Sequence, residues 1–228
     1  MRNLIIIEGT IAAGKTMTLN RLKGCYRDRL VYVKEPVQYF KGMLNLYYQN
    51  KERYILPLQI LIAESRIREM EKLLSQKNDD RPIIMERSVK SGEIFCKLIT
   101  PKEKEMKVIK EIWDEGDRIL HNFDWVCYHL KVTNEETIQN QIERNKNTNE
   151  GIIDSKYLKQ INQLYNEHCE QLYWNKIKRF ENFELPFNER RTYEQKLSLI
   201  RKHINQLIKK DDTNSTITKE SRSERNYV

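Results

Sequence analysis

Eight residues near the N-terminus have the types and the spacing that bind the phosphates of a nucleotide. They are Gly9, Thr10, Ile11, Ala12, Ala13, Gly14, Lys15 and Thr16, which match the P-loop pattern G-x-x-x-x-G-K-[ST]. The glycines allow the loop to fold around phosphate oxygens, and its backbone N–H groups carry partial positive charge. We expect Lys15 to bridge the outer phosphates and the Thr16 hydroxyl to bind Mg²⁺. The pattern therefore predicts a site for ATP and Mg²⁺.

Acidic residues follow two strand-like runs farther along the chain. Glu35 precedes Pro36, which disfavours helix at Glu35 and holds this carboxylate on extended backbone. A kinase that phosphorylates an alcohol needs a carboxylate that accepts the hydroxyl proton, and Glu35 is the candidate for this base. Glu86 and Arg87 add an acid suited to Mg²⁺ and a cation suited to developing phosphoryl charge. A surface carboxylate and a helix-terminal ion pair are the simpler alternatives.

The segments that would position these residues alternate between strands and helices. Because parallel strands need long crossover connections, the alternation favours an α/β fold, in which a parallel sheet of about five strands is flanked by helices. This is the P-loop kinase architecture, in which ligands bind beyond the carboxyl ends of the strands. Short apolar runs predict the strands at 4–7, 30–34, 82–85, 124–132 and 179–186.

The helices are predicted from apolar residues spaced by three and four positions. Two helices cover 41–75, and single helices cover 102–121, 134–145, 157–173 and 192–209. The polar loop over 145–151 is expected to act as a mobile lid. We expect residues 1–209 to form one catalytic domain and residues 210–228, which lack apolar periodicity, to form a disordered tail.

Composition excludes several classes of protein. The net charge of +8 comes from basic residues that are scattered and often paired with acids, so we expect no stable nucleic-acid partner. The four cysteines form no CxxC pair, which argues against a zinc site and a thioredoxin-like motif. We find neither a signal-peptide pattern nor an apolar run long enough to cross a bilayer, and we expect a cytoplasmic protein without a membrane partner.

In combination, several motifs resemble the deoxynucleoside kinase family of deoxycytidine, deoxyguanosine and insect multisubstrate kinases. The resemblance runs from about Leu4 to Tyr173 and implies transfer of the ATP γ-phosphate to the 5′-hydroxyl of a deoxynucleoside, in nucleotide salvage. It implies that Glu35 is the general base, that Glu86 and Arg87 match the glutamate and arginine of the family's Glu-Arg-Ser motif, and that Gln59 pairs with the edge of the base. The motifs are Glu35-Pro36-Val37, Pro57-Leu58-Gln59, Ser65-Arg66-Ile67-Arg68 and Glu86-Arg87-Ser88-Val89.

The resemblance also implies contacts to the sugar and to the base. Tyr48 matches the tyrosine that contacts the sugar 3′-hydroxyl, and Phe40 matches the aromatic residue that lines the base site. Tyr47 is assigned to the substrate site with them. Packing of these rings on a helix face is the alternative. The family commonly forms homodimers, so we expect a homodimer here.

The predicted lid carries basic residues that the resemblance places over the phosphates. Arg144 and Lys146 fall at its basic positions, and Glu150 falls at its acidic, sugar-facing end. The lid departs from the family in length and has a lysine where arginine is usual. A solvated polar turn is the alternative.

Base selectivity depends on Arg66 and Gly92. Arg66 resembles the arginine of the deoxycytidine and purine-type enzymes, but Gly92 stands where its aspartate partner is usual. Because a buried guanidinium without an acid is costly, we expect Arg66 to turn to Glu93, to the ligand or outward. We also expect Gly92 to leave space beside the base, so that the pocket is permissive and accepts thymidine.

Two other functions remain open at this point. A nucleoside monophosphate kinase, such as thymidylate kinase, shares the P-loop and a basic lid, but its phosphorylated acceptor needs an additional cluster of cations. A protein that uses ATP as a switch while it holds nucleic acid would show salt-sensitive DNA binding and no nucleoside-dependent ATP turnover.

Overall fold

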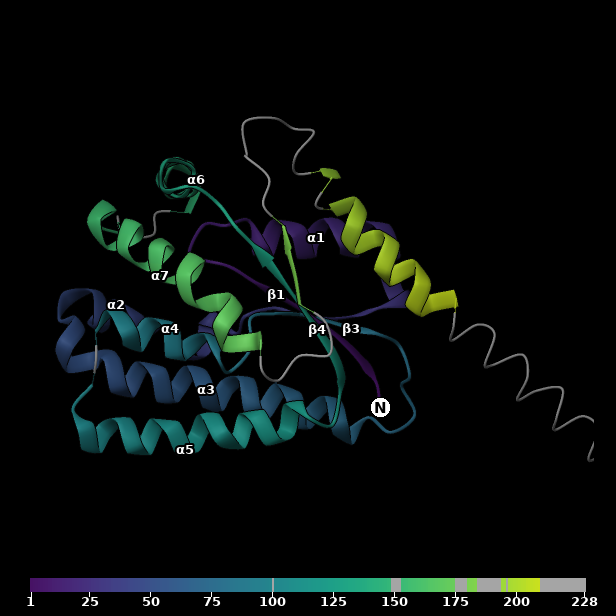
Figure 1. The fold of residues 1–228 in the computed structure, drawn as a ribbon, viewed down its shortest axis with the longest axis horizontal. Coiled ribbons are helices and arrows are strands. Elements are labelled where there is room, and N and C mark those ends of the chain that lie inside the picture. The colour runs from purple at the N-terminus through teal and green to yellow at the C-terminus, as the bar shows by residue number, and fades with distance from the viewer. Residues whose placement is uncertain (100, 149–152, 175–179, 184–193, 196, 210–228) are drawn as a thin grey trace, which may run out of the picture.

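The computed structural model describes residues 1–99, 101–148, 153–174, 180–183, 194–195 and 197–209. Within these residues, five parallel strands form one sheet in the order β2-β3-β1-β4-β5 (Figure 1). The predicted α/β fold with a parallel sheet is therefore confirmed. The strands are β1 (Asn3–Glu8), β2 (Val31–Val33), β3 (Ile83–Glu86), β4 (Asp124–Leu130) and β5 (Phe180–Phe183).

Helices connect the strands and cover both faces of the sheet (Figure 1). The described part of the C-terminal segment, 194–195 and 197–209, is also helical. Short 3₁₀ turns, η1 (Arg27–Arg29) and η2 (Val37–Tyr39), flank β2. The helices are α1 (Lys15–Tyr26), α2 (Lys41–Gln49), α3 (Lys51–Ser75), α4 (Ser91–Leu98), α5 (Glu103–Leu120), α6 (Asn134–Thr148) and α7 (Ser155–Trp174).

The central strand β1 is buried on both faces, which explains its continuous apolar sequence. Leu4 and Ile6 join the core beneath α3, α4, α5 and α7. Ile5 and Ile7 point the other way, into the core beneath α1 and the helical segment 197–209. Alternate side chains of one strand thus hold both helical layers against the sheet and fix where its carboxyl end lies.

Several boundaries differ from the prediction. The proline at position 57 lies inside α3, which begins six residues earlier, where the Asn50 side chain accepts a hydrogen bond from the Arg53 backbone. Helix α6 continues to Thr148, so much of the segment predicted as a lid loop is helical. The predicted tail, 210–228, lies outside the described residues, and the division at residue 209 stays a prediction.

No helix among the described residues is long and apolar enough to span a membrane. All four cysteines are free thiols, and only Cys25 is exposed.

Candidate active site

The P-loop joins the end of β1 to the start of α1 and needs glycine at both positions that the motif specifies. Gly9 and Gly14 have φ angles of 152° and 83°, in the region that side chains rarely adopt. A Cβ on Gly9 would also lie 2.9 Å from the carbonyl oxygen of Leu130. Ala12 adopts a positive φ of 62° as well, which keeps the loop tightly curled.

Lys15 is buried in the hollow of this loop. Its ammonium group donates to the carbonyl oxygens of Gly9 and Thr10 over 3.0 and 2.6 Å. Burial, followed by the nearby charge of Arg87, lowers the pKa of Lys15 to about 7. Burial makes the charged form of Lys15 energetically costly, and the negative charge of a bound phosphate would offset that cost.

Thr16 and Glu86 face each other from α1 and β3. The Thr16 hydroxyl donates to the Glu86 carboxylate over 2.8 Å. A hydroxyl and a carboxylate are hard oxygen ligands, and Mg²⁺ in kinases is typically held by one or two carboxylates together with phosphates. The two residues predicted to bind Mg²⁺ are therefore together and chemically suited to it.

Glu35 lies between two arginines just beyond β2. Its two carboxylate oxygens lie 2.5 Å from Arg66 Nη2 and 3.3 Å from Arg87 Nε. Burial tends to raise the pKa of Glu35, but the charges of Arg87, Arg66 and then Lys15 outweigh it and lower the pKa below its usual value. Glu35 is consequently ionised at neutral pH and fixed in orientation.

Arg87 is held from several sides. Its backbone adopts φ 65°, unusual for a residue with a side chain, and its N–H donates to the carbonyl oxygen of Ile7 over 3.0 Å. The guanidinium carbon lies 5.3 and 5.5 Å from the ring centroids of Phe95 and Tyr165, and its Nη1 donates to the Tyr165 hydroxyl. Neither ring was identified from the sequence, because α4 and α7 meet Arg87 only through the tertiary fold.

Arg66 has an acidic partner that was not among the alternatives left open by the sequence. Its guanidinium turns inward and donates to the carbonyl oxygen of Ser88 over 2.7 Å and to the Ser91 hydroxyl over 2.8 Å. Its acidic partner is Glu35. Arg66 therefore orients the candidate base, and an aspartate at position 92 is not needed to balance its charge.

The space predicted beside Gly92 does not exist. A Cβ at this position would lie 2.8 Å from Gln59 Oε1 and 2.9 Å from Trp113 Nε1. These side chains fill the place of the usual aspartate, so glycine at 92 reflects close packing. The expectation of an open, permissive pocket at this point is wrong.

A cavity of about 1190 Å³ connects these groups, and aromatic side chains form part of its lining. Phe40, Tyr47, Tyr48 and Tyr157 line it. The Tyr47 and Tyr157 hydroxyls lie 3.1 Å apart, whereas the rings of Tyr48 and Tyr157 meet edge to face at 6.2 Å. The three predicted aromatic residues are thus together, and Tyr157 from α7 joins them.

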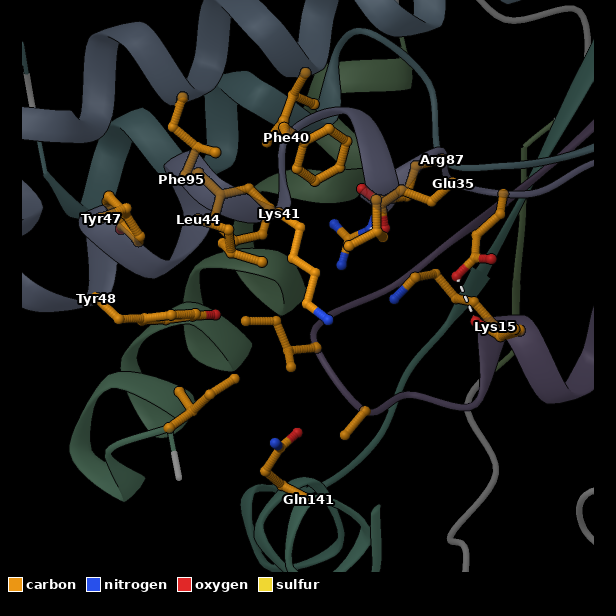
Figure 2. A pocket seen from close by; sticks show the side chains of 18 of the residues that line it. Lys15, Glu35, Phe40, Lys41, Leu44, Tyr47, Tyr48, Arg87, Phe95 and Gln141 are labelled. Carbon is orange, nitrogen blue, oxygen red and sulfur yellow. Dashed lines mark hydrogen bonds and ion pairs between the residues drawn. The ribbon is translucent and has the colours of Figure 1, made fainter. Parts of the chain in front are cut away.

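Cations and polar groups occupy other sides of the same space. Figure 2 shows Lys15, Lys41 and Arg87 directed into it, with Tyr48 and Gln141 at other parts of its wall. Gln59 from α3 also lines the cavity. Lys41 and Gln141 were not predicted, because neither belongs to a local motif.

The predicted lid residues are only partly described. Arg144 and Lys146 lie within α6, but their side chains are outside the described residues, as is all of Glu150. Earlier in α6, the Asn140 side chain donates to the carbonyl oxygen of Ala12 over 3.1 Å, and Gln141 lines the cavity. Helix α6 therefore contacts the P-loop directly.

Comparisons with known proteins agree with this architecture. The family model described as deoxynucleoside kinase matches residues 5–209. A solved structure of the deoxyadenosine kinase from M. mycoides, with the products dCMP and a flexible dCDP bound, is similar with a TM-score of 0.67 and 20% sequence identity. The similarity covers 89% of this chain and 99% of that one. No curated protein sequence matches the chain significantly.

Proposed function

Because the chain belongs to the deoxynucleoside kinase family, we propose that Glu35 activates the 5′-hydroxyl of a bound deoxynucleoside for attack on the γ-phosphate of ATP. Family membership makes the chain a kinase of deoxynucleosides, which favours a hydroxyl acceptor over a nucleoside monophosphate. The donor and the roles of single residues are our proposal.

The observation that carries the proposal is the placement of Glu35 between Arg66 and Arg87, on the cavity that also holds Lys15. A carboxylate fixed in this way can accept a hydrogen bond from the 5′-hydroxyl and take its proton as the oxygen attacks phosphorus. Its lowered pKa makes it a weak base. That suits a loose phosphoryl transition state, in which orienting the nucleophile matters most.

Positive charge surrounds the path of the phosphoryl group. Lys15 lies on the P-loop side of the cavity and Arg87 lies beside Glu35. In our proposal, Lys15 binds the outer phosphates of ATP, and Arg87 stabilises charge that develops as the phosphoryl group moves. Both cations are buried, so their electrostatic effect is weakly screened by solvent.

Thr16 and Glu86 would hold Mg²⁺, which when bound neutralises charge on the phosphates of the donor. The hydrogen bond between them shows that the P-loop end of α1 and the end of β3 already meet at this point. The fold therefore brings both side chains to one place.

The aromatic and amide residues complete the acceptor site. We propose that Phe40 lies against the base, that Gln59 faces its edge and that Tyr48 contacts the sugar. Tyr47 lines the same wall, and its hydroxyl lies 3.1 Å from that of Tyr157. The similar M. mycoides enzyme is named for deoxyadenosine and was solved with a deoxycytidine product. We therefore expect more than one base to be accepted.

We also propose a cytoplasmic homodimer with no stable nucleic-acid partner. The four free thiols suit a reducing compartment. We expect a dimer because the family commonly forms homodimers. Sedimentation of the purified chain at micromolar concentration would test this expectation.

The test is to incubate the purified protein with ATP, Mg²⁺ and each of the four deoxynucleosides, and to separate the products by chromatography. We expect ADP and a 5′-monophosphate in equal amounts with at least one nucleoside, and neither product with Lys15→Ala. The proposal fails if ATP is consumed only with a nucleoside monophosphate as acceptor, or if no deoxynucleoside is phosphorylated.

A further inference from the structure

Glu8, the last residue of β1, carries a buried carboxylate close to the candidate active site. The residue is fully buried and is not among those that line the cavity. Its Oε1 accepts a hydrogen bond from the backbone N–H of Ser88 over 2.9 Å. A carboxylate that accepts from a backbone N–H makes a strong, charge-assisted hydrogen bond. Glu8 therefore joins the end of β1 to the segment that follows β3.

This hydrogen bond lies where the chain leaves the sheet after β3. The pairing of β1 with β3 ends at Ile7 and Glu86. The N–H of Arg87 then donates to the carbonyl oxygen of Ile7 over 3.0 Å, and the backbone of Arg87 turns with a φ of 65°. The next N–H, that of Ser88, donates to the Glu8 side chain. Two successive residues of β1 thus accept from two successive N–H groups of the turn.

The backbone conformation of Arg87 depends on contacts of this kind. A residue with a side chain rarely adopts a positive φ, and the strain persists only where the surroundings hold the backbone in place. Ser88 is only 1% exposed, so its N–H would be buried without an acceptor if Glu8 were lost. The turn would then shift to pair this N–H elsewhere, and Arg87 would move with it.

The carbonyl group of Ser88 contacts the second arginine of the site. Arg66 donates to this oxygen over 2.7 Å, and it also lies 2.5 Å from one carboxylate oxygen of Glu35. Arg87, which directly precedes Ser88, lies 3.3 Å from the other oxygen of Glu35. The positions of both arginines around Glu35 therefore depend on the position of Ser88.

We propose that Glu8 is a positioning residue for phosphoryl transfer, which fixes Ser88 and through it the two arginines around Glu35. The inference rests on the proposed function, because it takes Glu35 as the base. Glu8 does not line the cavity, so its effect should appear in the rate of transfer and not in the affinity for the nucleoside. The decisive property of its side chain is that an oxygen reaches the Ser88 N–H.

Two substitutions of Glu8 separate the reach of the side chain from its charge. Glu8→Asp keeps the charge, but its side chain is one methylene group shorter and leaves the Ser88 N–H without its acceptor. Glu8→Gln loses the charge but presents an oxygen acceptor at the same reach. We expect kcat to fall about ten- to a hundredfold in Glu8→Asp, as misplacement of catalytic groups typically causes. Glu8→Gln should stay within a few-fold of the wild type, and nucleoside affinity measured by calorimetry should change little in both.

Amide hydrogen exchange at Ser88, followed by NMR, tests the hydrogen bond without turnover. The Ser88 N–H should exchange about tenfold faster or more in Glu8→Asp than in the wild type, and Glu8→Gln should keep most of the protection. Asp79→Asn is the matched control, since Asp79 pairs with Arg81 and Arg2 just before β3 and β1, at the opposite ends of the same two strands. This variant should lose stability but keep the wild-type kcat and the slow exchange of Ser88.

The outcomes separate this inference from the proposed function. Unchanged exchange of the Ser88 N–H in Glu8→Asp overturns the inference, and so does a wild-type kcat in that variant. A loss of kcat of about tenfold or more in Glu8→Gln overturns it independently, because charge and not reach would then set the rate. Faster exchange in Glu8→Asp, with no deoxynucleoside phosphorylated by the wild type, supports the hold of Glu8 on Ser88 and overturns the proposed function.

Discussion

Tyr165 is the residue through which α7 holds Arg87, and removing its hydroxyl tests how the site is positioned. The hydroxyl is buried and accepts a hydrogen bond from Arg87 Nη1. Tyr165→Phe would leave that charged donor without its partner, which typically costs about 1–3 kcal/mol. The ring and its contact with the guanidinium would remain.

We expect this loss to appear both in stability and in catalysis. If half of it falls on the transition state, kcat drops about two- to tenfold, since each 1.36 kcal/mol is a factor of about ten in rate. KM for the nucleoside should change little, because the hydroxyl of Tyr165 lies behind Arg87. Steady-state kinetics and thermal unfolding of the same preparations measure the two effects.

Tyr128→Phe is the matched control. Tyr128 is equally buried, and its hydroxyl lies 2.6 Å from Nδ1 of His203, on the other face of the sheet. This variant should lose stability but keep the wild-type kcat. The reasoning is refuted if Tyr165→Phe keeps the wild-type kcat, or if both variants lose kcat equally.

Three further predictions concern charge and packing. Because the pKa of Lys15 lies at about 7, protonated Lys15 is lost from the free enzyme as the pH rises through that value. A pH profile should therefore show kcat/KM for ATP falling above pH 7, while kcat, measured with phosphate bound, stays level. Arg66→Gln removes one of the charges that lower the pKa of Glu35. The acid limb of its kcat/KM profile should move to higher pH, and an unmoved limb would exclude Glu35 as the titrating base. Gly92→Asp should lower the free energy of unfolding by about 1–3 kcal/mol, as overpacking typically does, and denaturant unfolding that matches the wild type would show that the position is open.

The sequence predicted those parts of the site whose geometry is set within one short segment of the chain. The P-loop follows from glycines that its backbone requires, and the strand ends at Glu35 and Glu86 follow from short apolar runs that stop at polar residues. Since carboxyl ends of parallel strands share one edge of the sheet, these residues had to meet.

Contacts between elements that are far apart in the sequence could not be predicted in this way. The partner of Arg66 proved to be Glu35, and the place beside Gly92 is filled by Trp113 from α5. Tyr165 reaches Arg87 from a helix 78 positions along the chain. Such pairs depend on how α3, α4, α5 and α7 pack, and no spacing within a single segment encodes them.

The central claim is that Glu35 takes the proton of the attacking hydroxyl, and Glu35→Gln tests it most directly. The amide keeps the shape of the side chain but cannot accept a proton. With ATP and the best deoxynucleoside, kcat should fall about a hundredfold or more, while nucleoside affinity measured by calorimetry stays within a few-fold and circular dichroism shows a folded protein. A variant that binds nucleoside and forms the 5′-monophosphate at the wild-type kcat would contradict the account.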